Sequence, residues 1–137
     1  MRRSGVALLL ALCACARTQG ATVAIGRSVF HVQIAATEAL REHGLMGVRT
    51  LAPDRGMFFL WDDVAARDFY MKDTLIPLDL ISIRAHKVVG VATMIPCTKD
   101  PCLITTTPPA DAALEVPAGT AKRAGIATGA LVDFSAF

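Results

Sequence analysis

The sequence lacks the pattern of a nucleic-acid-binding protein. It contains no run of basic residues interleaved with aromatic residues, which is the pattern that follows a phosphate backbone. The formal net charge of +2 includes Arg2 and Arg3, which belong to an N-terminal segment that we expect to be removed. The rest of the chain is close to neutral, so we expect no nucleic-acid partner.

Patterns for nucleophilic catalysis and for metal binding are also missing. There is no G-x-S-x-G elbow, and no His or Cys stands at zinc-like spacing. A Cu(I) site could use four methionines and two reduced cysteines: Met46, Met57, Met71, Met94, Cys97 and Cys102. However, Met in apolar strands usually fills gaps in a core. We therefore expect neither a metal nor a cofactor, and enzyme activity is the minority interpretation.

No apolar run is long enough to span a bilayer. The run from Val6 to Leu12 falls well short of the ~20 residues that a spanning helix needs. Two arginines precede it and small residues follow from Ala14 to Ala16, which is the pattern of an export signal. We expect a signal peptide over residues 1–14.

The end of this signal resembles the bacterial lipobox. Leu12-Cys13-Ala14-Cys15 places a Leu three residues, and a small residue one residue, before a cysteine. Cleavage before Cys15 would leave a lipid-anchored protein in the periplasm, on the outer or the cell membrane, with residues 15–21 as a tether to a domain over residues 22–137. The alternative is cleavage after Ala14, Ala16 or Ala21, which would give a soluble secreted protein.

Cysteine is scarce in the rest of the chain. If Cys15 is acylated, Cys97 and Cys102 are the only remaining thiols. In an oxidising compartment this Pro-flanked C-x4-C loop most simply indicates a local disulfide. So short a loop gains roughly 2 kcal/mol at best from the bond, which would therefore shape the loop more than it stabilises the domain.

The sequence does contain a series of short strand patterns. Its 137 residues, 53% of them apolar, suffice for one core and are too few for two ordinary domains. We predict strands over 22–25, 29–34, from 56, 78–84, 87–95, 113–116 and 130–134, and short helices over 38–43 and 118–124. Strands do not alternate with long helices, so we predict a mostly β (α+β) fold, a compact antiparallel β-barrel or sandwich.

A small polar group interrupts the most apolar stretch, Gly56 to Asp79. Its members are candidate ligand-binding residues, with two aromatic residues as possible walls: Lys72, Asp73, Thr74 and Asp79, with Trp61 and Tyr70. Asp79 shares a strand face with Ile81 and Ile83, so a buried carboxylate there needs a cation or hydrogen-bond donors. We expect Lys72, Thr74 or backbone amides near Pro77 to supply them, either as a structural cluster or as a binding site.

Other candidates for acid–base chemistry are weaker. Asp79 and Glu115 could form a carboxylate pair that acts on a glycoside, but their sequence positions carry no distance information. We interpret His31, His43 and His86 as solvated surface residues.

Five motifs, in order, resemble the domain-of-unknown-function 192 family. They are HGLM at 43–46, GMFFLW at 56–61, FYMKDTLIPLDL at 69–80, the loop from Pro96 to Cys102, and ALEVPAGTAKRAGI at 113–126. The chain departs from the family pattern at Tyr70, where Trp is frequent, at Asp73, where Asn is common, and at Leu103, where Pro often stands. The resemblance implies a mostly β fold and no established enzymatic activity.

These observations leave three functional hypotheses. The first is an exported, lipid-anchored envelope domain that binds a small ligand or a partner. The second is a hydrolase-like enzyme that uses the cluster of Lys72 and Asp79. The third is a purely structural envelope protein.

Overall fold

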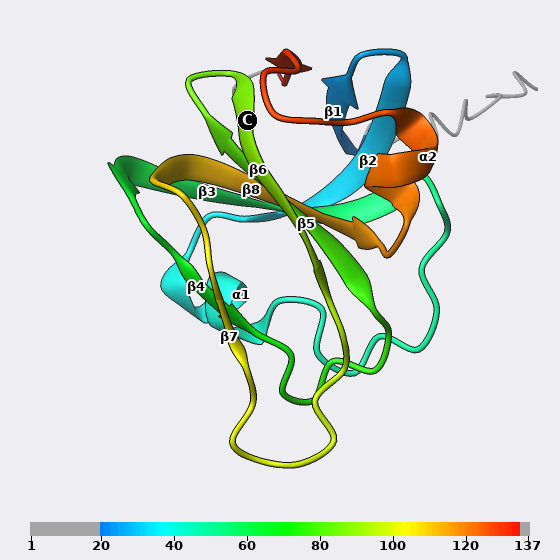
Figure 1. The fold of residues 1–137 in the computed structure, drawn as a ribbon, viewed down its shortest axis with the longest axis vertical. Helices are drawn as coiled ribbons and strands as arrows, with labels where there is room; N and C mark the ends of the chain where they lie inside the picture. The colour runs from blue at the N-terminus through cyan, green and yellow to red at the C-terminus, as the bar shows by residue number, and fades with distance from the viewer. Residues whose placement is uncertain (1–19, 135–137) are drawn as a thin grey trace, which may run out of the picture.

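Alternating apolar residues build one large curled sheet. The computed structural model describes residues 20–134, in which seven strands pair in the order β6-β5-β8-β3-β2-β1-β9 (Figure 1). Their bounds are β1 Ala21–Ile25, β2 Ser28–Ala35, β3 Arg55–Ala65, β5 Leu78–Arg84, β6 Lys87–Met94, β8 Ala110–Pro117 and β9 Val132–Asp133. A two-stranded ribbon pairs β4 (Asp68–Tyr70) with β7 (Ile104–Thr106), and the helices are α1 (Glu38–His43) and α2 (Thr120–Ala124).

The large sheet curls until its two edges meet at one end. β9 pairs with β1, and Leu131, just before β9, forms a bridge with Lys87 at the start of β6. The amide of Val88 donates to the carbonyl of Ala130 at 2.9 Å. The result is a curled half-barrel with two short helices, which confirms the predicted mostly β fold.

One strand pair departs from the antiparallel arrangement. β2 and β3 run parallel, with His31 opposite Arg55 and Ala35 opposite Phe59. A parallel pair needs a long crossover connection, and the segment between Ala35 and Arg55 supplies it through α1. The first helix has the predicted bounds: Thr37 caps it by accepting from the Leu40 amide at 3.3 Å, and Gly44 ends it.

Both faces of β3 are buried, as the sequence predicts. Phe58 packs into the inner core, which the curled sheet encloses, whereas Met57 and Phe59 pack on its outer face. Figure 1 shows α1 and the β4–β7 ribbon on the opposite side of the large sheet from α2. This outer face carries the candidate site.

The cysteine loop lies between β6 and β7. Cys97 and Cys102 form a disulfide with their Cα atoms 5.6 Å apart, which confirms the predicted pairing. Neither residue lines the pocket described below.

The expectations for the N-terminus fall outside the described residues. They are the signal peptide over 1–14, lipidation of Cys15, and all but the last two residues of the tether over 15–21. Within residues 20–134, neither helix combines the length and the apolar character needed to cross a bilayer.

Candidate functional site

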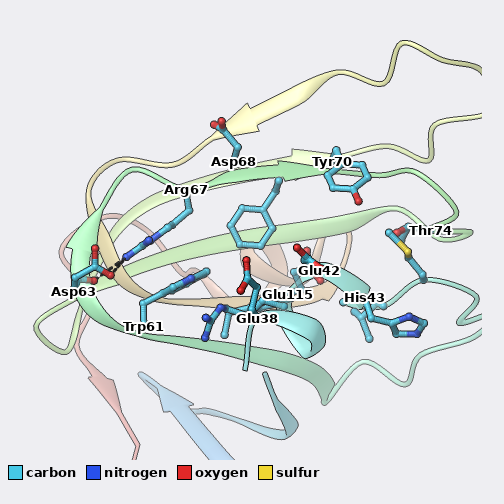
Figure 2. A pocket seen from close by; sticks show the side chains of 16 residues that line it. Glu38, Glu42, His43, Trp61, Asp63, Arg67, Asp68, Tyr70, Thr74 and Glu115 are labelled. Atoms are coloured by element: carbon cyan, nitrogen blue, oxygen red, sulfur yellow. Dashed lines mark hydrogen bonds and ion pairs between the residues drawn. The ribbon is translucent and has the colours of Figure 1, made fainter. Parts of the chain in front are cut away.

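A pocket of about 530 Å³ opens on the outer face of the sheet, beside α1 and β4 (Figure 2). Residues from five separate segments line it: Glu38, Arg41, Glu42, His43, Gly44, Leu45, Met46, Phe59, Trp61, Asp63, Arg67, Asp68, Phe69, Tyr70, Thr74 and Glu115. Figure 2 shows Asp63, Trp61 and Arg67 at one end, His43 and Thr74 at the other, and Glu115 between them. The tertiary fold therefore brings these five segments together to form the site.

Glu115 is the buried acidic residue of the pocket. It lies in the middle of β8, opposite Met57 of β3 and Leu80 of β5, and its residue is only 6% exposed. Because side chains alternate along a strand, Glu115 points to the same outer face as Ala113. Among residues 20–134, no donor forms a hydrogen bond or an ion pair with its carboxyl group.

This burial changes the charge state of Glu115. Loss of contact with water disfavours the ionised form and raises the pKa of Glu115 from 4.5 to about 8. At neutral pH the group is mostly protonated, so it can donate a hydrogen bond as a neutral acid. It can ionise readily if a cation enters the pocket.

Aromatic rings form the wall beside Glu115. Phe59 and Phe69 meet edge to face with centroids 5.3 Å apart, and Trp61 lies 6.2 Å from each of them. Tyr70, 43% exposed, adds a ring that is open to solvent. The pocket therefore combines an aromatic wall with a lining of mostly polar and charged side chains.

The positive charges of the pocket are held at the Trp61 end. Arg67 pairs with Asp63 and places its guanidinium carbon 4.7 Å from the centre of the Trp61 ring. Arg41 lies 5.7 Å from the same centre and donates at 2.8 Å to the carbonyls of Ala36 and Leu60. Within the described chain, the Nε atom of Arg67 is the one buried side-chain nitrogen or oxygen without a hydrogen-bond partner.

Three of the six predicted ligand-binding residues line this pocket: Trp61, Tyr70 and Thr74. Lys72 is exposed and instead pairs with Asp100 at 3.2 Å, and this hydrogen bond raises the pKa of Lys72. Asp73 lies in a turn with a φ of 56°, and its carbonyl accepts from the Gly47 amide. Neither residue is part of the pocket wall.

Of the predicted partners of Asp79, the two side chains are wrong: the carboxylate contacts neither Lys72 nor Thr74. It accepts from the Thr93 hydroxyl at 2.7 Å and from the Ala121 amide at 2.9 Å, and so caps the start of α2. A backbone amide is among the predicted partners, and the segment that supplies it bonds to Pro77 through the Ala118 amide. Asp79 lies opposite Val116 in the sheet, the neighbour of Glu115. Side chains alternate along a strand, so the two acids point to opposite faces and cannot form the glycosidase-type pair.

Sequence reasoning missed most of the acidic and basic residues in the pocket. They are Glu38, Arg41, Glu42 and His43 of α1, Asp63 and Arg67 near the end of β3, and Asp68 of β4. Nothing in their local sequence indicates that these segments meet. Glu115 did carry a signal, because it stands between two apolar strand residues, Leu114 and Val116.

Two solved structures are similar to this chain in sequence and in fold. The chain is similar to a protein from Sinorhizobium meliloti 1021 described as a "putative transcription regulator", with 30% identity, a TM-score of 0.77, and coverage of 83% of this chain and 92% of that one. It is also similar to a protein of unknown function from Novosphingobium aromaticivorans DSM 12444, with 33% identity, a TM-score of 0.74, and coverage of 82% and 83%.

No curated protein matches the chain significantly. The sequence profile of the domain-of-unknown-function 192 family, described as "Uncharacterized ACR", matches residues 21–134. This match spans every strand and helix of the described structure. The chain belongs to the domain-of-unknown-function 192 family.

Proposed function

We propose that the protein is an exported, lipid-anchored envelope domain that binds a small ligand in the pocket beside Glu115. One observation carries the proposal: Glu115, a residue that is 6% exposed, lines a pocket with an aromatic wall, and its carboxyl group has no protein partner in the described chain. An unpaired buried acid costs stability, and proteins retain such costs where function needs them. A ligand would supply the missing partner.

The sole tryptophan of the chain, Trp61, reports on this pocket. We expect at least one compound in a set of small cations, anions and sugars to change Trp61 fluorescence in a saturable way. The apparent affinity for that compound should be at least tenfold lower in Glu115→Gln. Asp54→Asn, an exposed carboxylate outside the pocket, is the matched control and should bind as the wild type does.

The same titration separates the structural hypothesis from the binding hypothesis. A purely structural protein should show no saturable change with any compound, and that result would refute the proposal. The hydrolase hypothesis receives no support from its original residues, since Lys72 pairs with Asp100 and Asp79 with Thr93 and the Ala121 amide.

The description of the Sinorhizobium relative raises DNA binding as another candidate. The residues of this chain do not favour it. Helix-turn-helix proteins place a recognition helix in the major groove. The two helices of the described residues are only six and five residues long. We therefore do not extend that role to this protein.

The membrane anchor rests on the sequence around Cys15. A diacylated cysteine partitions firmly into a membrane, because each buried CH₂ group contributes ~0.8 kcal/mol. We expect the wild-type protein to fractionate with membranes and Cys15→Ser to become soluble in the periplasm. Equal solubility of the two proteins would show that lipidation at Cys15 is wrong. The Cys97–Cys102 disulfide supports export, because such bonds persist in oxidising compartments.

A further inference from the structure

We propose that the ligand is an organic ammonium ion, held by the carboxylates of Glu115 and Glu42 and by the ring of Tyr70. This inference rests on the proposed function and names the ligand class of the same pocket. It follows from the excess of carboxyl groups in the pocket, from the buried and unpaired carboxyl of Glu115, and from the exposed ring of Tyr70.

Carboxyl groups outnumber guanidinium groups in the lining of the pocket. Arg67 pairs with Asp63, whereas Arg41 donates to two backbone carbonyls and keeps its positive charge. The carboxylate of Asp68 accepts from the Thr106 hydroxyl at 2.6 Å. Three carboxyl groups remain without a hydrogen bond or ion pair among residues 20–134: those of Glu38, Glu42 and Glu115. The carboxylates of Glu38, Glu42 and Asp68 outnumber the one guanidinium without a carboxylate partner, that of Arg41, so a cation entering here would meet a net negative charge even while Glu115 is protonated.

The two glutamates of α1 reinforce this charge. Glu38 and Glu42 are four residues apart in the helix, so they lie on the same side of it, and like charges at this spacing destabilise a helix. Both line the pocket. A bound cation would relieve their repulsion.

The described residues of the pocket form no group of three metal ligands. In the described part of the chain, one trio of His, Cys, Asp or Glu has ligand atoms within 4.8 Å of one another, and it is Cys97, Asp100 and Cys102. The two sulfurs of that trio form the disulfide. The pocket carboxylates form no such trio, which favours an organic cation over a metal ion that needs several oxygen ligands around it.

Aromatic side chains also favour an ammonium ion, and they indicate where it binds. Trp61 already has the guanidinium groups of Arg41 and Arg67 near its ring, so a further cation is repelled from that end. Tyr70 is exposed and makes no ring contact within the described residues. Ammonium groups bind over such ring faces, so we place the cation at the end near Tyr70, Thr74 and His43 (Figure 2).

Glu115 couples this binding to protons. The cation stabilises the ionised carboxylate, so binding should release the proton that Glu115 holds below pH 8. Other titratable or charged groups line the same pocket and face Glu115 from α1, β3, the segment after it and β4: Glu38, Arg41, Glu42, His43, Asp63, Arg67, Asp68 and Tyr70.

The experiment compares matched probes on the purified protein through Trp61 fluorescence and calorimetry. The cations are choline and n-butylammonium, and the neutral controls are 3,3-dimethylbutan-1-ol, which replaces the nitrogen of choline by carbon, and n-butanol. We expect at least one cation to bind more than tenfold more tightly than its neutral counterpart at pH 8. Since the ionised fraction of Glu115 sets the apparent affinity, the cation should bind roughly 50-fold more weakly at pH 6 than at pH 8.

Variants test which residue carries the effect. Glu115→Gln should lose more than tenfold in cation affinity at pH 8 and most of the pH dependence. Glu42→Gln, an exposed change, should lose several-fold, and Asp54→Asn should behave as the wild type. Equal binding of cation and neutral isostere, or an unchanged affinity in both glutamate variants, would overturn the inference. If sugars or anions bind and ammonium ions do not, the ligand class is wrong while the proposed binding function stands.

Discussion

Urea unfolding should show the domain losing roughly 4 kcal/mol of stability between pH 5 and pH 9 through Glu115 alone. The folded state holds the proton of Glu115 up to a pKa of about 8, whereas the unfolded chain releases it near 4.5. The folded state therefore binds more protons across this window. Its extra stability is complete below pH 4.5 and is lost as the pH rises to about 8.

Glu115→Gln is the matched variant for this prediction. The amide cannot ionise, so the variant should have a nearly flat stability profile and should be more stable than the wild type at pH 9. Asp54→Asn should keep the wild-type profile, because Asp54 is exposed. Parallel profiles for the wild type and Glu115→Gln would show that the carboxylate finds donors in solution. The assignment of Glu115 as an unpaired buried acid would then be wrong.

Asp79→Ala should lower the free energy of unfolding by ~1–3 kcal/mol, because it leaves two donors, one of them a buried amide, without their acceptor. Those donors are the Thr93 hydroxyl and the Ala121 amide, and the loss should also fray α2. Lys72→Met should leave the urea midpoint close to that of the wild type, since Lys72 makes only an exposed ion pair with Asp100. Urea unfolding of the single and double variants measures both effects.

The double variant Asp79→Ala with Lys72→Met should be additive, because the two side chains have different partners. Asp79→Asn keeps one acceptor oxygen and should cost less than Asp79→Ala. Recovery of stability in the double variant would instead reveal a coupled pair, contrary to the observed contacts. Neither change at Asp79 should alter ligand binding, because Asp79 lies on the inner face of the sheet, away from the pocket.

Local sequence patterns predicted the elements that depend on local chemistry. Strand β5 has the predicted bounds, Leu78–Arg84, and α1 lies between its predicted cap at Thr37 and its stop at Gly44. The hairpin after β5 was less predictable. Ala85 and His86 both adopt positive φ angles, 48° and 59°, which is the two-residue turn that Asn-Gly usually forms. An Ala-His pair gives no such signal, and here the Asp111 carboxylate accepts from the Ala85 amide at 3.1 Å.

The site depended on tertiary structure, so the sequence could predict only part of it. Three residues of the pocket, Trp61, Tyr70 and Thr74, could be predicted because they lie within the most apolar stretch of the sequence, Gly56 to Asp79. The α1 residues reach the pocket only through the parallel β2–β3 crossover, and Glu115 comes from a strand distant in sequence. The cap on α2 joins Asp79 to a residue 42 positions away, which no local pattern reveals.

The most direct measurement is a carbon-13 NMR titration of the Glu115 side-chain carboxyl in the ligand-free protein, assigned by comparison with Glu115→Gln. We predict a midpoint near pH 8, because the group is buried on the outer face of the sheet without a protein donor in the described chain. Choline or butylammonium should shift that midpoint downward. A midpoint near pH 4.5 in the free protein would contradict the buried, unpaired acid on which the proposed pocket depends.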